Sequence, residues 1–225
     1  MVREDGQGQS SSSNEQQHAI RQPSALFQRD VPGITYDQYS LEKEKEFLPQ
    51  IRELITKDLS EPYSIYVYRY FLYQWAELCL MALDDERRVV GVVICKLEPH
   101  RGGPLRGYIA MLATKEEHRG KGIATTLVSK AIDLMIEKDA DEIALETEET
   151  NTAAMKLYEK LGFLRSKKLH RYYLNGNSAY RLLLYLKPGV GAMQPGYDPY
   201  NDMPPSAGDL PPDDARHQLY KEEPT

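Results

Sequence analysis

Two glycines, Gly120 and Gly122, stand beside basic residues in the stretch EEHRGKGIATTLVSKAIDLM, directly before a run with helical periodicity. Glycine has no Cβ, so a ligand can closely approach the main-chain amides of such a turn. The first amides of a helix lack intrahelical partners, and with the helix dipole they favour an anion. The stretch therefore predicts a phosphate site flanked by Arg119 and Lys121. The simpler alternative is a turn that only ends a strand.

The spacing in this stretch does not fit two common phosphate-binding motifs. A dinucleotide fingerprint needs a third glycine three residues further on, and a P-loop needs Gly-Lys followed by Ser or Thr. Neither occurs in the run from Arg119 to Ala124. A strand ending near Thr114 and a helix after the turn would still direct several amides into one cavity, which suits a pyrophosphate group.

A candidate general base lies in the segment ALETEET. Side chains alternate along a strand, so Ala144, Glu146 and Glu148 share one face, and Leu145 and Thr147 share the other. Glu146 could therefore face an opening in the sheet and accept a proton there. The alternative is a solvated acid among the neighbouring glutamates.

The segment NTAAMKLYEKLGF predicts a helix that Asn151 caps and Gly162 ends. Tyr158 lies seven residues after Asn151, about two turns along the same side, so both could face one ligand. A tyrosine on an apolar helix face is also a common core residue. Both interpretations of Tyr158 stay open at this point.

Hydrophobic periodicity predicts the other elements that must hold these residues. Helical spacing runs through 41–55 behind Ser40 as a possible N-cap, with Pro49 inside it. The segment YSIYVYRYFLYQWAE is ambiguous, because its Tyr and Val residues favour a strand while its apolar stripe favours a helix. We predict a helix there.

Apolar runs bounded by turn-like segments predict the strands. They are CLMAL, VVGVVICKL, RGYIAMLAT, DEIALET, FLRSKKLHRYYL and SAYRLLLYL, and a long helix covers 123–137 after the third of them. The order is two helices, three strands, a helix, a strand, a helix and two strands. It indicates a mixed α/β layer built around one sheet.

Composition limits the class of protein. The net charge of −6 and the pI near 5.5 argue against a nucleic-acid binder. Cys79 and Cys95 form neither a disulfide framework nor a metal motif, which suits a reducing compartment, and we expect a cytoplasmic protein. We expect no metal, because His100, His118 and His170 lack ligand spacing. We also expect no signal peptide and no membrane span.

The chain divides into three regions by composition. Residues 1–30 are rich in Ser, Gln and charge and are expected to be disordered. Residues 31–187 form the expected folded domain. Residues 188–225 are dense in proline and acid, which is typical of a solvated tail or a docking peptide.

Two of these motifs together resemble a known family. Arg119-x-x-Gly122-x-Ala124 resembles the acyl-coenzyme A motif of the GCN5-related N-acetyltransferases (GNAT), and NTAAMKLYEKLGF resembles their Asn-helix-Tyr-x-x-x-Gly-Phe segment. The resemblance covers about residues 33 to 187. It implies an α/β fold with a seven-stranded, mostly antiparallel sheet, splayed between its fourth and fifth strands, and about four helices. It also implies acetyl-coenzyme A as the cofactor.

The resemblance assigns roles to the candidate residues. Glu146 would be the general base, through an ordered water, because an α-amine with a pKa near 7.7 to 8.0 must lose a proton before it attacks. Tyr158 would protonate the leaving thiolate. The implied cofactor contacts are Leu112, Ala113, Arg119, Gly120, Lys121, Gly122, Ile123, Ala124, Thr125, Asn151 and Tyr158.

Further segments narrow the resemblance to enzymes that acetylate the N-termini of nascent chains: DLSEPYSIYVYRYFL, LRGYIAMLA, DEIALETE and HRYYLN. The implied acceptors begin with Met followed by Leu, Ile, Phe, Tyr or Trp. The implied partners are a large auxiliary subunit, a small Sm-like subunit and, through them, the ribosome, with no direct contact to nucleic acid or membrane. The implied substrate-binding residues are Leu59, Glu61, Pro62, Tyr63, Tyr108, Tyr172 and Tyr173.

Three alternatives stay open. The tyrosines, which belong to a set of 16 in the chain, could be ordinary packing residues. The same fold could acetylate a lysine side chain or a small amine. The domain could also be a binding subunit with a decayed site, recruited through its proline-rich tail.

Overall fold

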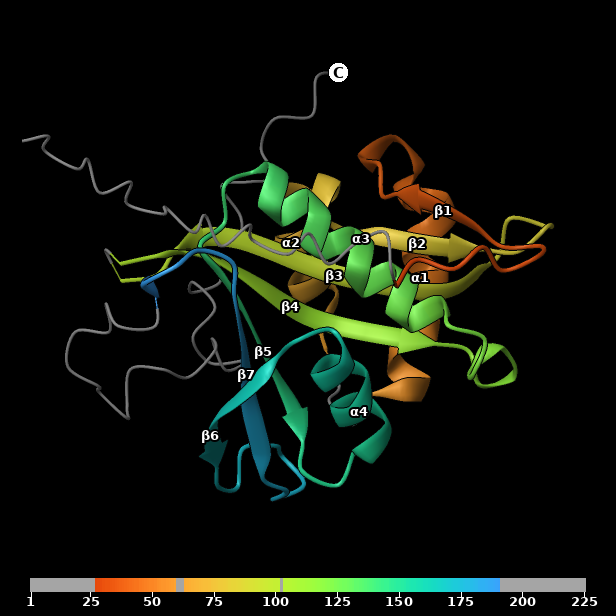
Figure 1. The fold of residues 1–225 in the computed structure, drawn as a ribbon. Coiled ribbons are helices and arrows are strands. Elements are labelled where there is room, and N and C mark those ends of the chain that lie inside the picture. Colours follow the sequence, from red (N-terminus) through yellow and green to blue (C-terminus); the bar gives the residue numbers. More distant parts are fainter. Residues whose placement is uncertain (1–26, 60–62, 102, 191–225) are drawn as a thin grey trace, which may run out of the picture.

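The computed structural model describes residues 27–59, 63–101 and 103–190, and within these ranges the chain forms one seven-stranded sheet (Figure 1). The strand order is β1-β2-β3-β4-β5-β7-β6. The strands are β1 (Thr35–Gln38), β2 (Leu80–Leu83), β3 (Val89–Pro99), β4 (Leu105–Thr114), β5 (Glu142–Glu148), β6 (Leu164–Leu169) and β7 (Ala179–Tyr185). The helices are α1 (Glu44–Asp58), α2 (Ile65–Gln74), α3 (Ile123–Glu137) and α4 (Thr152–Lys160).

All neighbouring strands pair antiparallel except β4 and β5, which are parallel. The expected α/β class with a mostly antiparallel mixed sheet is confirmed. Helices cover both faces, because α1 and α2 pack on one buried cluster while α3 and α4 pack on another (Figure 1). No helix among the described residues is long and apolar enough to cross a bilayer.

Helix α3 covers the residues predicted for it. Its side chains at Ile123, Leu127, Ala131 and Met135 are almost completely buried, which is the four-residue spacing of one helix face. Gly91 of β3 permits the close approach of this face. A Cβ on Gly91 would lie 3.0 Å from Cγ2 of Ile123 and 3.1 Å from Cδ1 of Leu127.

The ambiguous aromatic segment is the helix α2, as predicted. It buries Tyr68, Phe71 and Leu72 at helical spacing. The helix ends at Gln74, and the next residue, Trp75, donates a hydrogen bond of 3.0 Å from its indole Nε1 to the carbonyl oxygen of Leu97 in β3. This bond fixes the end of α2 beside the sheet.

Three expectations about element boundaries were wrong. Ser40 makes no side-chain capping bond, and a short 3-10 turn at Leu41–Lys43 separates it from α1, which begins at Glu44. The predicted run FLRSKKLHRYYL does not stay extended through Leu174, because β6 ends at Leu169. The strand β1 was absent from the element order drawn from periodicity, since TYDQ has no apolar run.

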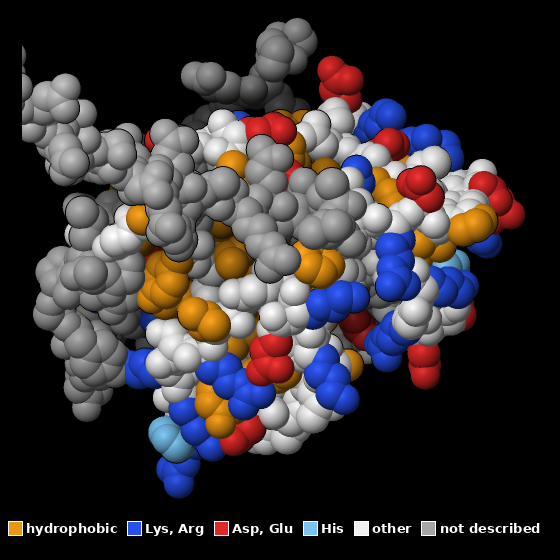
Figure 2. Space-filling model, viewed as in Figure 1, with side chains coloured by type: hydrophobic (Ala, Val, Ile, Leu, Met, Phe, Trp, Pro, Cys, Tyr) orange, Lys and Arg blue, Asp and Glu red, His pale blue; other side chains and the backbone are white. Residues whose placement is uncertain are grey.

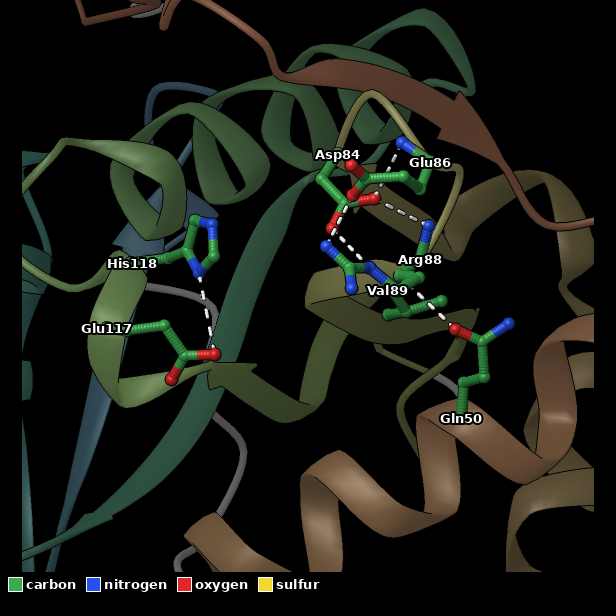
Figure 3. A network of polar contacts seen from close by, with 7 residues as sticks. All are labelled: Gln50, Asp84, Glu86, Arg88, Val89, Glu117 and His118. Atoms are coloured by element: carbon green, nitrogen blue, oxygen red, sulfur yellow. Dashed lines mark hydrogen bonds and ion pairs between the residues drawn. The ribbon is translucent and has the colours of Figure 1, made fainter.

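A polar network organises the turn between β2 and β3 and ties it to α1 (Figure 3). The Asp84 carboxylate accepts hydrogen bonds from the backbone N–H of Glu86 (3.1 Å) and of Arg88 (2.8 Å). The N–H of Val89 donates to Oε1 of Gln50 on α1 at 3.0 Å. The network therefore holds α1 in register with the sheet, and α1 carries Asp58 to the end of β4.

Strand β6 is an edge of the sheet and carries Arg165, Lys167 and Lys168. Figure 2 shows Lys and Arg side chains gathered over this end of the molecule. An exposed edge strand can pair with another chain, and charged side chains hinder that pairing. The basic residues of β6 therefore protect the open edge.

Residues 27–30, predicted to belong to a disordered extension, contact α3. Nε2 of Gln28 donates to the Asp133 carboxylate at 2.8 Å, and the N–H of Arg29 donates to Oγ1 of Thr126 at 3.1 Å. The remaining residues predicted to be disordered at the two ends lie outside the described residues, except for 188–190.

Candidate active site

The sheet opens between its two parallel strands. β4 and β5 pair only at Arg106 with Glu142, Gly107 with Ile143 and Tyr108 with Ala144. Beyond these pairs the strands run apart, as Figure 1 shows. The side of β4 that faces this opening has no partner strand among the described residues, while its other side pairs with β3.

Leu112 and Ala113 lie on the part of β4 that borders this opening. They pair with Val93 and Val92 of β3, so only their other side is open. Ala113 is buried, and Leu112 is partly buried. An extended ligand that carries amides could pair with this backbone as an added strand.

Glu146 lies two residues beyond the last pair of β4 and β5, and two donors hold its carboxylate. Nε of Arg181 on β7 donates to Oε1 at 2.7 Å. The hydroxyl of Tyr108 on β4 donates to Oε2 at 2.8 Å. The side chain of Glu146 is 4% exposed, so it is a buried acid and not a solvated one.

Aromatic side chains surround this carboxylate. Burial raises the pKa of Tyr108 and of Tyr172, and the negative charge of Glu146 raises both further. Tyr63 lies close enough to act on the same two phenols. The structure thus brings together tyrosines from the segment before α2, from β4 and from the loop between β6 and β7. The phenols of Tyr108 and Tyr172 stay protonated at neutral pH, because the pKa of each is raised.

The structure describes two of the other four predicted substrate-binding residues. Tyr173 packs edge to face on Tyr172, with ring centroids 5.1 Å apart. Leu59 packs on the buried cluster beneath α1 and α2. Glu61 and Pro62 lie outside the described residues, so the expectation for them stays a prediction.

The glycine turn before α3 has the left-handed backbone that glycine favours. Gly120 has φ of +76° and Gly122, the N-cap residue, has φ of +94°. The space at Gly120 is open, since a Cβ placed on it would meet no atom beyond its chain neighbours within 4 Å. The N–H of Thr126 makes the first intrahelical bond, to Gly122. The amides before it in α3, those of Ile123, Ala124 and Thr125, are the ones a helix leaves without intrahelical partners.

These residues fit a pyrophosphate group. Three amides at a helix N-terminus, open space at a glycine and the exposed Lys121 form a cradle for an anion. The Ile123 side chain is buried in the core, so only its amide can face a ligand. The Arg119 guanidinium is paired with the Asp58 carboxylate of α1, and its Nε donates to the Thr114 carbonyl at 3.3 Å. Arg119 therefore anchors the turn, and its contact to a cofactor stays a prediction.

Helix α4 carries two predicted site residues. Oδ1 of Asn151 accepts the N–H of Ala154 at 3.0 Å, so the predicted N-cap is confirmed, and its side-chain NH₂ is a separate donor group. Tyr158 is 5% exposed and packs edge to face on Phe163, with ring centroids 5.5 Å apart. Burial raises the pKa of Tyr158, so its hydroxyl keeps a proton that it can donate.

No group of three or more metal-ligating side chains occurs in the described part of the chain. Nδ1 of His118 lies 3.9 Å from the Glu117 carboxylate, within the short 3-10 turn at Glu116–His118 (Figure 3).

The candidate active site thus has two parts. One is the Glu146 carboxylate, which is surrounded by phenols, and the other is the anion cradle before α3. Such a combination suits proton transfer and the binding of a phosphorylated ligand.

Two residues of the site, Arg181 and Asp58, were not predicted from the sequence. Arg181 is a charged residue inside the apolar run SAYRLLLYL, which is an unusual place for a guanidinium. That anomaly was a usable signal. Asp58 gives no such signal, because it stands at the end of an amphipathic helix where a charged residue is ordinary.

Comparisons with known proteins agree on one family. The family model described as the acetyltransferase (GNAT) family matches residues 48–163, just over half of the chain. The chain is 58% identical over 140 residues to N-alpha-acetyltransferase 30 of Schizosaccharomyces pombe, covering 62% of this chain and 93% of that protein. It is 52% identical over 174 residues to the human protein of the same name, covering 75% of this chain but only 46% of the human one.

Two solved structures are also similar. One is described as the NatC complex bound to Gag peptide and CoA, and its matching chain has a TM-score of 0.67 and 50% identity, covering 68% of this chain and 99% of that chain. The other is Arabidopsis thaliana Naa50 in complex with a bisubstrate analogue, CoA-Ac-MVNAL, with a TM-score of 0.58 and 25% identity, covering 68% and 98%.

Proposed function

Because this chain belongs to the acetyltransferase (GNAT) family, we propose that it moves an acetyl group from acetyl-coenzyme A to the α-amine of protein N-termini. The family model and the identity to named N-alpha-acetyltransferases confirm the predicted family and the predicted enzyme class, an N-terminal acetyltransferase. The observation that carries the proposal is the 58% identity to a protein named N-alpha-acetyltransferase 30, of which this chain covers 93%.

Acetyl-coenzyme A supplies the acetyl group as an activated thioester. The amides that open α3 hold its pyrophosphate, and the open side of β4 at Leu112 and Ala113 pairs with its amide-bearing arm. Asn151 donates a hydrogen bond to the same ligand from the start of α4. A main-chain amide of β4 also stabilises the negative charge that develops on the carbonyl oxygen during transfer.

Two side chains move the protons. As the family resemblance implies, Glu146 accepts through an ordered water the proton that the α-amine must lose, and Arg181 and Tyr108 hold its carboxylate in place. Tyr158 keeps its proton at neutral pH because burial raises its pKa, and it delivers that proton to the departing thiolate. Base and acid thus stand on different elements, β5 and α4.

The acceptors that we propose are proteins whose N-terminus is Met followed by Leu, Ile, Phe, Tyr or Trp. Tyr63, Tyr108, Tyr172 and Tyr173 supply an aromatic wall beside the base, where a large apolar side chain can be buried. Leu59, Glu61 and Pro62 are the further residues that we propose bind the peptide.

We further propose that the chain works in a complex of the NatC type, with a large auxiliary subunit and a small Sm-like subunit, and reaches nascent chains at cytoplasmic ribosomes. The similar chain at 50% identity belongs to a structure described as the NatC complex. That complex is the precedent for this assembly.

A peptide panel tests the proposal. Met-Leu, Met-Ile and Met-Phe peptides are compared with Ser-Ala and Met-Asp peptides, with the auxiliary subunits present and absent. Each Met-Leu peptide is also supplied with a blocked α-amine and a free internal lysine. We expect labelling of the Met-hydrophobic peptides and none of the blocked ones. Labelling of the blocked peptides would favour a lysine acetyltransferase, and no thermal shift with acetyl-coenzyme A would favour a decayed binding subunit.

A further inference from the structure

Strand β5 carries two buried glutamates, and each pairs with an arginine of a neighbouring strand. Glu142 accepts from Nε of Arg106 on β4 at 2.6 Å, and Glu146 accepts from Nε of Arg181 on β7 at 2.7 Å. The glutamates are four residues apart, so they lie on the same face of the strand. The first pair lies where β4 and β5 are hydrogen-bonded, and the second lies where they have separated.

The second pair is poorly explained as a device for stability. Its side chains are 9% and 4% exposed, so both charges are largely removed from water. Removing two charges from water is costly, and an apolar pair of the same size is often as stabilising as a buried ion pair. A purely structural β5–β7 pairing would therefore be served equally well by apolar side chains.

Geometry gives the second pair a different use. Arg181 is the direct cross-strand partner of Glu146, and Tyr108 reaches the same carboxylate from β4. The two donors approach different oxygens from opposite sides of the opening. Together they fix the plane of the Glu146 carboxylate. Its remaining lone pairs therefore point in fixed directions. A base must be held this closely, because an error of about 1 Å in placement can cost roughly 100-fold in rate.

We propose that Arg181 is a positioning residue for the acetyl-transfer reaction, acting through Glu146 by orienting its carboxylate toward the opening between β4 and β5. Arg181 touches neither the amine nor the thioester in this proposal, which rests on the proposed function. Among the described residues, the charged and titratable groups that face Glu146 include Arg181 on β7, Tyr108 on β4 and Tyr172 in the loop between β6 and β7.

A double-mutant cycle tests this role. Arg181→Met, Glu146→Gln and the double variant are compared for kcat with a Met-Leu peptide and for coenzyme A affinity by calorimetry. We expect Arg181→Met to lower kcat on the order of 100-fold with the affinity for coenzyme A unchanged. The double variant should be no slower than Glu146→Gln, because residues that act as a unit are not additive. A kcat near wild type for Arg181→Met, or a double variant slowed by the product of both effects, overturns the proposal.

Arg106→Met is the matched control, since it breaks a buried pair of the same kind at the closed end of the strands. We expect it to lower the melting temperature and to leave kcat within about twofold of wild type. If Arg181→Met does not fold, Arg181→Lys replaces it in the cycle. Lysine keeps the charge but not the planar donor, so it should restore the fold and regain only part of kcat.

A spectroscopic measurement makes the test independent of turnover. The buried Nε–H of Arg181 should give a slowly exchanging proton resonance that Arg181→Lys removes and Glu146→Gln shifts or broadens. An unchanged resonance in Glu146→Gln overturns the pair itself. If the wild-type chain acetylates no peptide, the proposed function fails, but the resonance still shows whether Arg181 and Glu146 form an ion pair. If the wild type is active and Arg181→Met equals it, only the positioning role fails.

Discussion

At the scale of single residues, the site depends on a carboxylate that is buried and accepts one hydrogen bond at each oxygen. Glu146 is held by Arg181 and Tyr108, and neither donor comes from its own strand. Holding it between two strands places it where an amine can approach from the opening.

Glu146→Gln should separate binding from turnover. The amide keeps the shape of the side chain and a hydrogen bond to one donor, but it cannot accept the proton that the α-amine loses. We expect kcat for a Met-Leu peptide to fall by about 10² to 10⁴ while coenzyme A binds as before. Steady-state kinetics and calorimetry on the same preparation check this. A variant that acetylates at the normal rate would show that another group is the base.

The sequence predicted Glu146, and Tyr108 as a substrate-binding residue, but neither the bond between them nor the pairing of Glu146 with Arg181, and the reason is physical. Strand alternation in ALETEET assigns faces from local order alone. The pairing of Glu146 with Arg181 depends on the register between β5 and β7, which are separated in the chain by α4 and β6. Register is set by how the whole sheet packs, so it cannot be read from either segment. Only the isolated charge in SAYRLLLYL pointed toward a buried partner.

Gly122 offers a second test at the residue scale. Its φ of +94° is unfavourable for any side chain, and a Cβ there would lie 3.1 Å from Cδ of Arg29. We expect Gly122→Ala to cost about 1–2 kcal/mol of stability and to weaken coenzyme A binding, because the amides that open α3 move with the turn. Thermal melting and calorimetry measure the two effects.

Gly189→Ala is the matched control for this substitution. Gly189 has φ of +81° and open space around its Cβ position to 4 Å, and it lies outside the site. The strain should be similar, but the affinity for coenzyme A should not change. Equal loss of affinity in both variants would mean that the effect of Gly122→Ala is general destabilisation and not a change in the phosphate cradle.

At the scale of elements, prediction succeeded where periodicity was long and failed where it was short. Helix α3 has fifteen residues of regular apolar spacing, and its limits were predicted without error. Strand β1 has four residues and exposes both ends, so its pairing with β2 rather than its composition makes it a strand. The start of α1 shifted because Leu41–Lys43 form a 3-10 turn, in which the N–H of Lys43 donates to the Ser40 carbonyl at 3.1 Å, before α1 begins at Glu44.

The segment before β1 allows a prediction about how α3 is held. Two chains are compared, one beginning at Phe27 and one beginning at Val31. The shorter chain loses the bonds of Gln28 to Asp133 and of Arg29 to Thr126, together with the packing of Phe27 on the core. We expect it to be less stable by about 1–2 kcal/mol, or roughly 3–6 °C in melting temperature. Equal melting temperatures would mean that these contacts contribute nothing.

At the scale of the whole molecule, the two faces of the sheet do different work. The cluster under α1 and α2 contains aromatic rings that pack on β2 to β4 and hold the closed part of the sheet together. The cluster under α3 and α4 joins both halves of the split sheet, since it includes residues of β3, β4, β5 and β7. The two sides of the opening between β4 and β5 are therefore held in one structure by the continuous core under α3 and α4.

The buried tyrosines make stability of the whole fold sensitive to alkaline pH. Burial raises the pKa of Tyr108 and of Tyr158 above the value near 10 that each has in the unfolded chain. Both phenols bind their protons more tightly when folded, so their contribution is complete below pH 10 and is lost as the pH rises above it. Linkage sets the loss at about 1.4 kcal/mol per phenol for each pH unit above 10.

Melting curves between pH 8 and pH 11 check this expectation. The melting temperature should be level up to about pH 9.5 and then fall, and Tyr158→Phe should fall less steeply than the wild type, because one buried phenol is gone. Tyr66→Phe is the control, since Tyr66 is 44% exposed and its loss removes no buried phenol. Loss of ion pairs contributes equally to all three proteins in this range, so it cancels in the comparison. Identical slopes for wild type and Tyr158→Phe would contradict the assignment of Tyr158 as a buried, protonated acid.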